Sequence, residues 1–174
     1  KDQAARMAHV MFAGVTHTPA IDLADSLVEL TPPNLTKVFF SDNGSTAIEV
    51  ALKMSLQYWQ QVGEKIRTRF IYLTGGYHGE TLGALSVCGI KLFREKFENA
   101  LMENLEVKGP DCYRCPFDLS PESCEAECFE PLQKTLEENG KTIAGVIIEP
   151  LVQGAAGMKM YPPVYLKKLE KICE

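Results

Sequence analysis

The sequence lacks the features that mark membrane proteins and nucleic-acid-binding proteins. No apolar run approaches the roughly 20 residues that cross a bilayer, and residues 1–6 lead into no signal-peptide core. Lys and Arg (18) are outnumbered by Asp and Glu (23), which gives a net charge of -5, and no basic cluster would attract DNA, RNA or an anionic membrane. We therefore expect a cytoplasmic protein whose partner is a small molecule.

Internal repeats and low-complexity stretches are also missing, which excludes solenoid and fibrous architectures. With 174 residues, 45% of them apolar, the chain is long enough to bury a core, and we expect residues 1–174 to form a single partial domain. The 6 cysteines do not indicate secretion, because Cys88 and Cys173 lie in apolar helical patterns where buried, reduced thiols are common.

Short apolar, β-prone segments alternate with helical patterns along the chain. The expected strands are residues 38–40, 70–73 and 146–148. Helical spacing follows Pro19 as far as Pro32, starts again at Thr46 in a capping box with Glu49, and recurs at 81–88 and after Pro163. This alternation predicts an α/β fold with a mainly parallel sheet flanked by helices.

The pattern is lost between about residues 94 and 133, which we expect to be a Cys- and Pro-rich excursion from the sheet. Four cysteines there have spacing that resembles a four-thiolate zinc site, with free loop thiols as the alternative: Cys112, Cys115, Cys124 and Cys128. The last helical pattern reaches Glu174 without a C-cap signal, and we interpret the chain as an internal fragment.

Each expected strand runs into polar or glycine-rich residues, and in parallel sheets ligands bind beyond the carboxyl ends of the strands. The first such turn, Asp42 to Thr46, combines hydroxyls with the unpaired N–H groups of a helix N-terminus, which suit a phosphate monoester. The Walker pattern and the three-glycine dinucleotide fingerprint are absent. The alternative is a plain strand-to-helix turn with a well-capped helix.

Two further turns complete the expected site. Glycines flank Tyr77 and His78, so the backbone there can approach a ligand while the Tyr77 ring stacks on a heteroaromatic group. A glycine turn with a core tyrosine and a structural histidine is the alternative. Glu149 ends the third expected strand, where burial requires a partner for its carboxylate, although a half-exposed carboxylate fits the pattern equally well.

Taken together, these motifs resemble those of one family, the class III aminotransferases. The resemblance covers nearly the whole chain and is carried by residues 9–12, 16–20, 40–53, 76–81, 113–116 and 148–158. It implies the large domain of the aspartate-aminotransferase-like fold (fold type I) and pyridoxal 5'-phosphate as the cofactor. The residues expected to bind this cofactor are Gly44, Ser45, Thr46, Tyr77, His78 and Glu149.

The resemblance also implies roles for these residues. Gly44 and Ser45 hold the phosphate, Tyr77 stacks on the pyridine ring and lines the substrate side, and Glu149 supports the aspartate that pairs with the ring nitrogen. That aspartate and the lysine that binds the cofactor covalently have no counterpart in this chain, so we expect no catalytic residue here and no activity of the chain alone.

The finer resemblance is to family members that act in biotin biosynthesis, moving an amino group from S-adenosylmethionine to 8-amino-7-oxononanoate. Relatives that use ornithine or 4-aminobutyrate carry a glutamate where this chain has Ala155. The resemblance further implies a homodimer. Two alternatives stay open: another class III aminotransferase acting on an ω-amino acid or a polyamine, and a non-catalytic anion-binding module on the same fold.

Overall fold

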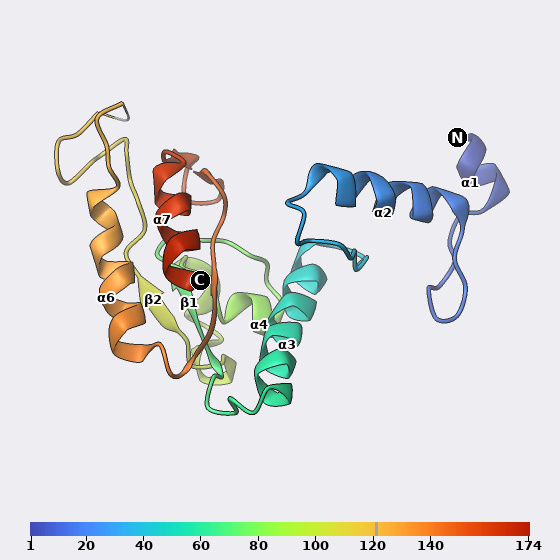
Figure 1. Cartoon of the computed structure of the whole chain (residues 1–174), viewed down its shortest axis with the longest axis horizontal. Helices are drawn as coiled ribbons and strands as arrows, with labels where there is room; N and C mark the ends of the chain where they lie inside the picture. Colours follow the sequence, from blue (N-terminus) through green and yellow to red (C-terminus); the bar gives the residue numbers. More distant parts are fainter. Residues whose placement is uncertain (121) are drawn as a thin grey trace. The chain divides into compact units, whose positions relative to one another are not determined.

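The computed structural model describes residues 1–120 and 122–174, and the chain divides into two compact units, residues 1–40 and 41–174 (Figure 1). The first unit contains helices α1 (Asp2–Arg6) and α2 (Thr18–Leu30). As predicted, α2 has a proline in its first turn and ends before Pro32. The expectation that residues 1–174 belong to one domain of the whole protein stays a prediction.

The second unit is built on a parallel sheet. Strands β1 (Arg69–Leu73), β2 (Leu105–Val107) and β3 (Ile143–Ile147) pair in the order β2-β1-β3, with Ile71 opposite both Leu105 and Val146. The helices of this unit are α3 (Gly44–Gln61), α4 (Leu82–Leu85), α5 (Lys91–Arg94), α6 (Glu130–Asn139) and α7 (Val164–Cys173). A short antiparallel pair, β4 (Val152–Gln153) with β5 (Lys159–Met160), follows β3, and single 3-10 turns occur at Glu98–Ala100 and Glu127–Phe129. The predicted α/β fold is confirmed.

Helices cover both faces of the sheet because β1 is apolar on both sides, as the central strand of a parallel sheet must be. Phe70 and Tyr72 pack with Leu52 of α3 on one face. Ile71 and Leu73 pack on the other face with the helices that follow β2 and β3, through residues that include Leu132, Tyr165 and Leu169. Figure 1 shows α3 and α4 on one side of β1 and α6 and α7 on the other.

The first expected strand, residues 38–40, is wrong. Val38, Phe39 and Phe40 have no regular secondary structure, although the segment is apolar and β-prone. A strand needs a second backbone with which to exchange hydrogen bonds, and within the described residues the sheets contain no partner for this segment. Local propensity favoured a strand but did not supply its neighbour.

The expected excursion between residues 94 and 133 is wrong in part. It contains β2, which pairs with β1, and the start of α6, where Pro131 stands in the first helical turn and does not break the helix. Two other predicted elements are present with different bounds. The helix expected at 81–88 is only Leu82–Leu85, and the strand expected at 146–148 is Ile143–Ile147.

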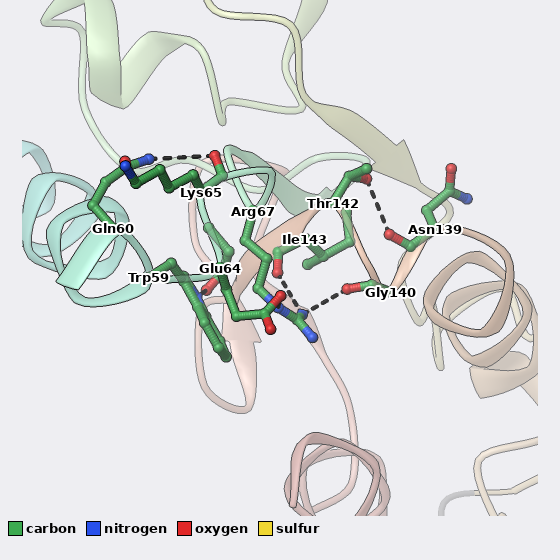
Figure 2. Close-up of polar contacts among 10 residues, drawn as sticks. Trp59, Gln60, Glu64, Lys65, Arg67, Asn139, Gly140, Thr142 and Ile143 are labelled. Carbon is green, nitrogen blue, oxygen red and sulfur yellow. Dashed lines mark hydrogen bonds and ion pairs between the residues drawn. The ribbon is translucent and has the colours of Figure 1, made fainter. Parts of the chain in front are cut away.

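Polar contacts join the starts of β1 and β3 to the end of α3 (Figure 2). The guanidinium of Arg67 donates from Nη1 to the carbonyl oxygens of Gly140, at 2.6 Å, and Ile143, at 3.1 Å. It also stacks over the ring of Trp59 with its Cζ 4.3 Å from the ring centre. The indole Nε1 of Trp59 donates to the carbonyl of Ala144 in β3 at 2.7 Å. These contacts fix the rotation of α3 on the sheet.

We expect the substitution Trp59→Phe to lower the free energy of unfolding by about 1–2 kcal/mol, because an aromatic ring remains, although a smaller one, while the carbonyl of Ala144 loses its donor. The neighbouring substitution Tyr58→Phe is the control, since Tyr58 is 56% exposed. It should change stability by less than about 0.5 kcal/mol. Urea unfolding of the protein that contains this chain measures both, and equal costs would contradict the assignment.

Candidate functional site

The first turn of α3 is closed by a capping box. Asn43 is the N-cap residue, and its Oδ1 accepts a hydrogen bond from the N–H of Thr46 at 3.0 Å, while the hydroxyl of Thr46 accepts from the N–H of Asn43 at 3.2 Å. The predicted box between Thr46 and Glu49 is therefore wrong by one turn. The reason is that Asn43 already has the extended backbone and the short polar side chain that an N-cap requires.

Capping leaves Gly44 and Ser45 as the residues of this turn that can meet a ligand. The hydroxyl of Thr46 also accepts from Ser41 Oγ at 2.6 Å and donates to the carbonyl of Asn43 at 3.0 Å, so its bonding capacity is used within the cap. The N–H groups of Gly44 and Ser45 have no acceptor within the helix. A Cβ on Gly44 would meet no atom within 4 Å, so the side-chain position of Gly44 is open.

The segment after β1, residues 74–80, lies against this first turn of α3. The N–H of Glu80 donates to Ser45 Oγ at 3.3 Å. A Cβ on Gly79 would lie 2.2 Å from the same oxygen, and Gly79 has φ +122°, a conformation that other residues rarely adopt. The structure thus brings together the two predicted turns, which we call the α3 turn (residues 43–46) and the aromatic turn (residues 74–80).

Tyr77 of the aromatic turn is held by two neighbours. Its hydroxyl donates to Glu80 Oε1 at 3.0 Å, and its ring packs edge-on against Phe93 with the ring centres 5.6 Å apart. The hydrogen bond to the Glu80 carboxylate, with a smaller effect of burial, raises the pKa of Tyr77 above its ordinary value. Tyr77 is therefore a neutral phenol at neutral pH, with the orientation of its ring restricted on one edge.

Glu149, which follows the end of β3, joins the aromatic turn to the β4–β5 hairpin. One carboxylate oxygen accepts from the N–H of Tyr77 at 2.8 Å and the other from the N–H of Gly154 at 2.9 Å. The predicted partner of this carboxylate therefore exists and consists of two backbone amides. A second tie comes from Gln153, which is 1% exposed and donates from Nε2 to the carbonyl of Thr74 at 3.1 Å.

His78 carries a polar atom for which the described residues supply no partner. Its Nε2 is buried and makes no hydrogen bond within residues 1–120 and 122–174. Burial lowers the pKa of His78 below its ordinary value, and the nearby Glu149 carboxylate opposes this only in part. The imidazole is therefore neutral at neutral pH, and its orphaned nitrogen is available to a group that binds beside the aromatic turn.

The depressed pKa of His78 predicts a dependence of stability on pH. Because the folded pKa lies below the unfolded value of 6.5, only the unfolded chain gains a proton at this residue as the pH falls past 6.5. Stability should therefore fall from about pH 7.5 to about pH 5.5, and should fall less in His78→Gln. Urea midpoints of the cofactor-free proteins measure this, and equal losses in wild type and variant would contradict it.

The four cysteines of the residue 94–133 segment are free thiols. Burial, and then the neighbouring Cys124, Cys112 and Cys115, raise the pKa of Cys128 to about 11. In the part of the chain that the structure describes, no three or more His, Cys, Asp or Glu side chains are grouped to hold a metal ion. This arrangement gives the zinc interpretation of the spacing no support, and both that interpretation and the free-thiol alternative stay predictions.

Three residues of the site, Glu80, Glu49 and Gly83, were not predicted from the sequence. Glu80 binds the hydroxyl of Tyr77, and Glu49 of α3 accepts from the N–H of Gly83 at 2.8 Å. The sequence did offer one signal: Gly79 and Gly83 are four residues apart, as are Ser45 and Glu49. Equal spacing of small residues and of polar residues is compatible with close packing of residues 79–83 on α3. Among the described residues, no helix is both long and apolar enough to cross a membrane.

Comparison with known proteins gives a consistent result. The family model described as aminotransferase class-III matches residues 1–174. Over the full chain, the adenosylmethionine-8-amino-7-oxononanoate aminotransferases of Geobacter sulfurreducens and Staphylococcus aureus are 45% and 43% identical, and the chain spans 39% of the length of each.

Solved structures agree. The adenosylmethionine-8-amino-7-oxononanoate aminotransferase of Methanocaldococcus jannaschii has a TM-score of 0.86 at 37% identity, with 99% of this chain and 36% of that one covered. An amine transaminase from an uncultivated Pseudomonas species in its PLP-bound form also has a TM-score of 0.86, at 36% identity, with 99% and 39% covered.

Proposed function

The chain belongs to the class III aminotransferase family, and from that premise we propose that the protein containing it transfers amino groups with pyridoxal phosphate as its cofactor. The observation that carries this proposal is the contact between the α3 turn and the aromatic turn through Ser45 and Glu80. It places anion-binding N–H groups beside an aromatic side chain, as a phosphorylated heteroaromatic ligand requires. Since the chain spans 39% of the first relatives' length, the activity of the whole protein is itself a proposal.

The residues present fit this cofactor. Gly44 offers an N–H and an open side-chain position, and Ser45 offers an N–H and a hydroxyl. Because Ser45 Oγ already accepts from the N–H of Glu80, its own proton is free to be donated to a phosphate oxygen. The Nε2 of His78, which has no partner among the described residues, lies in the aromatic turn. It is available to hydrogen-bond the cofactor ring or the aspartate that pairs with the ring nitrogen.

When bound, pyridoxal phosphate supplies an electron-accepting ring that makes amino transfer possible. In our proposal, Gly44 and Ser45 bind its phosphate and Tyr77 covers a face of the ring, with its hydroxyl held by Glu80. Thr46 contributes by closing the cap and does not touch the phosphate. Glu149 holds the backbone of Tyr77, and its remaining lone pairs can support the aspartate that pairs with the ring nitrogen.

For the substrate, we propose 8-amino-7-oxononanoate, with S-adenosylmethionine as amino donor. The proposal is supported by the names of the relatives that are 45% and 43% identical over the full chain. It is also supported by Ala155, an exposed residue in the turn between β4 and β5 where relatives with other substrates carry a glutamate. We further propose that the protein is cytoplasmic and that it is a homodimer, the second because the family resemblance implies it.

A second activity is favoured by one observation. The amine transaminase structure matches this chain with the same TM-score, 0.86, as the Methanocaldococcus jannaschii enzyme. The second candidate activity is therefore amino transfer from an amine, which the name of that structure gives for its own protein. The test is an assay of the full-length protein with 8-amino-7-oxononanoate as acceptor and a panel of donors, with products identified by mass spectrometry. We expect amino transfer from S-adenosylmethionine. Transfer only from ω-amines or polyamines would overturn the proposed donor, and no transfer from any donor would overturn the proposed acceptor.

A further inference from the structure

Helix α3 lies beside α4 in Figure 1, and two glycines, one before α4 and one in its first turn, lie very close to α3 side chains. Ser45 and Glu49 stand four residues apart on one face of α3. A Cβ on Gly79 would lie 2.2 Å from Ser45 Oγ, and a Cβ on Gly83 would lie 2.1 Å from Glu49 Oε2. The two glycines therefore accept the two α3 side chains, and the segments interlock at two points one helical turn apart.

A hydrogen bond accompanies each close approach. The N–H of Glu80 donates to Ser45 Oγ at 3.3 Å, and the N–H of Gly83 donates to Glu49 Oε1 at 2.8 Å. The second is the shorter and ends on a carboxylate, which makes it the stronger of the two. Glu49 therefore makes the stronger of the two hydrogen bonds that join α3 to the segment after the aromatic turn.

Packing alone does not account for a carboxylate at this position. Leu52, one turn further along α3, is 4% exposed and already packs the helix on Phe70 and Tyr72. Half-burying a carboxylate costs desolvation that an apolar side chain would avoid. Its charge also opposes phosphate binding one turn away. The favourable contribution of Glu49 is therefore the hydrogen bond that holds Gly83.

We propose that Glu49 is a positioning residue that sets the separation between the α3 turn and the aromatic turn. The inference rests on the proposed function, since a cofactor with a phosphate and a ring must contact both turns at once. When the separation is fixed, a ligand whose phosphate is bound to one turn holds its ring at a high effective concentration near the other, so it binds more tightly. A ligand that contacts only one turn gains no affinity from the fixed separation.

The test compares two ligands of the cofactor-free, full-length protein by titration calorimetry. Pyridoxamine phosphate contacts both turns and has no aldehyde, so only non-covalent contacts hold it, whereas inorganic phosphate contacts the α3 turn alone. We expect Glu49→Ala to weaken pyridoxamine phosphate binding about tenfold and phosphate binding by less than about twofold. Glu49→Gln keeps an acceptor for Gly83 and should stay within about threefold of wild type for both ligands.

Two controls separate positioning from a general loss of structure. Glu138→Ala on α6 removes an equivalent side chain from an exposed surface pair with Lys134 and should leave both affinities unchanged. Gly83→Ala should weaken pyridoxamine phosphate binding, because the three atoms nearest its new methyl group all belong to the Glu49 carboxylate. In that background Glu49→Ala removes the obstruction and should raise the affinity toward that of Glu49→Ala alone, the opposite of its effect beside Gly83.

The outcomes test the proposed function and the role of Glu49 separately. A wild-type protein that does not bind pyridoxamine phosphate overturns the proposed function. A wild type that binds it, with Glu49→Ala binding equally well, overturns the role of Glu49 alone. The role is also overturned if Glu49→Ala weakens binding of both ligands equally, or weakens pyridoxamine phosphate binding in the Gly83→Ala background as well.

Discussion

The substitution Gly89→Ala should produce the largest loss of stability of any single methyl group added at the candidate site. A Cβ there would lie 2.1 Å from the carbonyl oxygen of Leu73 and 2.6 Å from the nitrogen of Gly75. Both obstacles are backbone atoms, which cannot rotate away as side chains do. We expect the free energy of unfolding to fall by ~4 kcal/mol, together with loss of cofactor binding.

The physical reason is that Gly89 closes a backbone bridge over the end of β1. Its N–H donates to the carbonyl of Gly76 at 2.8 Å, and its carbonyl accepts from the N–H of Gly75 at 2.9 Å. A methyl group on residue 89 would push it away from residues 75–76, break these hydrogen bonds and displace the aromatic turn. Gly145→Ala in β3 is the matched control, since a Cβ there lies 3.6 Å from the Phe70 ring, an ordinary contact. Urea unfolding measures the free energy of unfolding of both variants. A loss for Gly89→Ala no larger than that for Gly145→Ala would contradict this account.

The second large effect is expected for Glu149→Gln. Glutamine preserves the shape of the side chain but replaces one carboxylate oxygen with an NH2 group, which then faces a backbone N–H. Because both oxygens accept backbone hydrogen bonds, from Tyr77 and Gly154, one bond is lost in either orientation. We expect a cost of about 2–3 kcal/mol in the free energy of unfolding and weaker binding of pyridoxal phosphate, by about tenfold.

A matched control for this substitution is Glu170→Gln on α7, where the carboxylate is exposed. That change should alter neither stability nor cofactor affinity by a measurable amount. Thermal unfolding and absorbance titration of the full-length protein measure both quantities. If the two variants behave alike, Glu149 does not hold the aromatic turn, and its partners in the structure make no net contribution.

Elements with strong local patterns could be predicted from the sequence. Phe70 to Leu73 are apolar throughout and lead into glycines, so β1 and the turn after it were identified within one residue. Helix α3 was also identified, because its apolar residues recur at three and four residue steps. The turns that carry Tyr77 and Glu149 were expected to meet because parallel strands end at one edge of a sheet, and a hydrogen bond joins them in the structure. The turn that carries Ser45 also meets them, although no sheet strand precedes it, because α3 packs beside β1.

Elements that depend on distant partners could not be predicted. Strand β2 is only Leu105–Val107, too short for its alternation to differ from chance, and it is a strand because β1 lies beside it. Val38 to Phe40 are the reverse case, with strand propensity but no paired backbone among the described residues. The contacts of Glu49 with Gly83 likewise depend on how two helices meet, which no local pattern contains.

The central claim, that the α3 turn binds the phosphate of pyridoxal phosphate, is tested most directly by a crystal structure of the full-length protein with that cofactor. We predict phosphate oxygens within hydrogen-bonding distance of the N–H groups of Gly44 and Ser45 and of the Ser45 hydroxyl, with the ring against Tyr77. A cofactor phosphate bound elsewhere, with the α3 turn facing only solvent, would contradict the account.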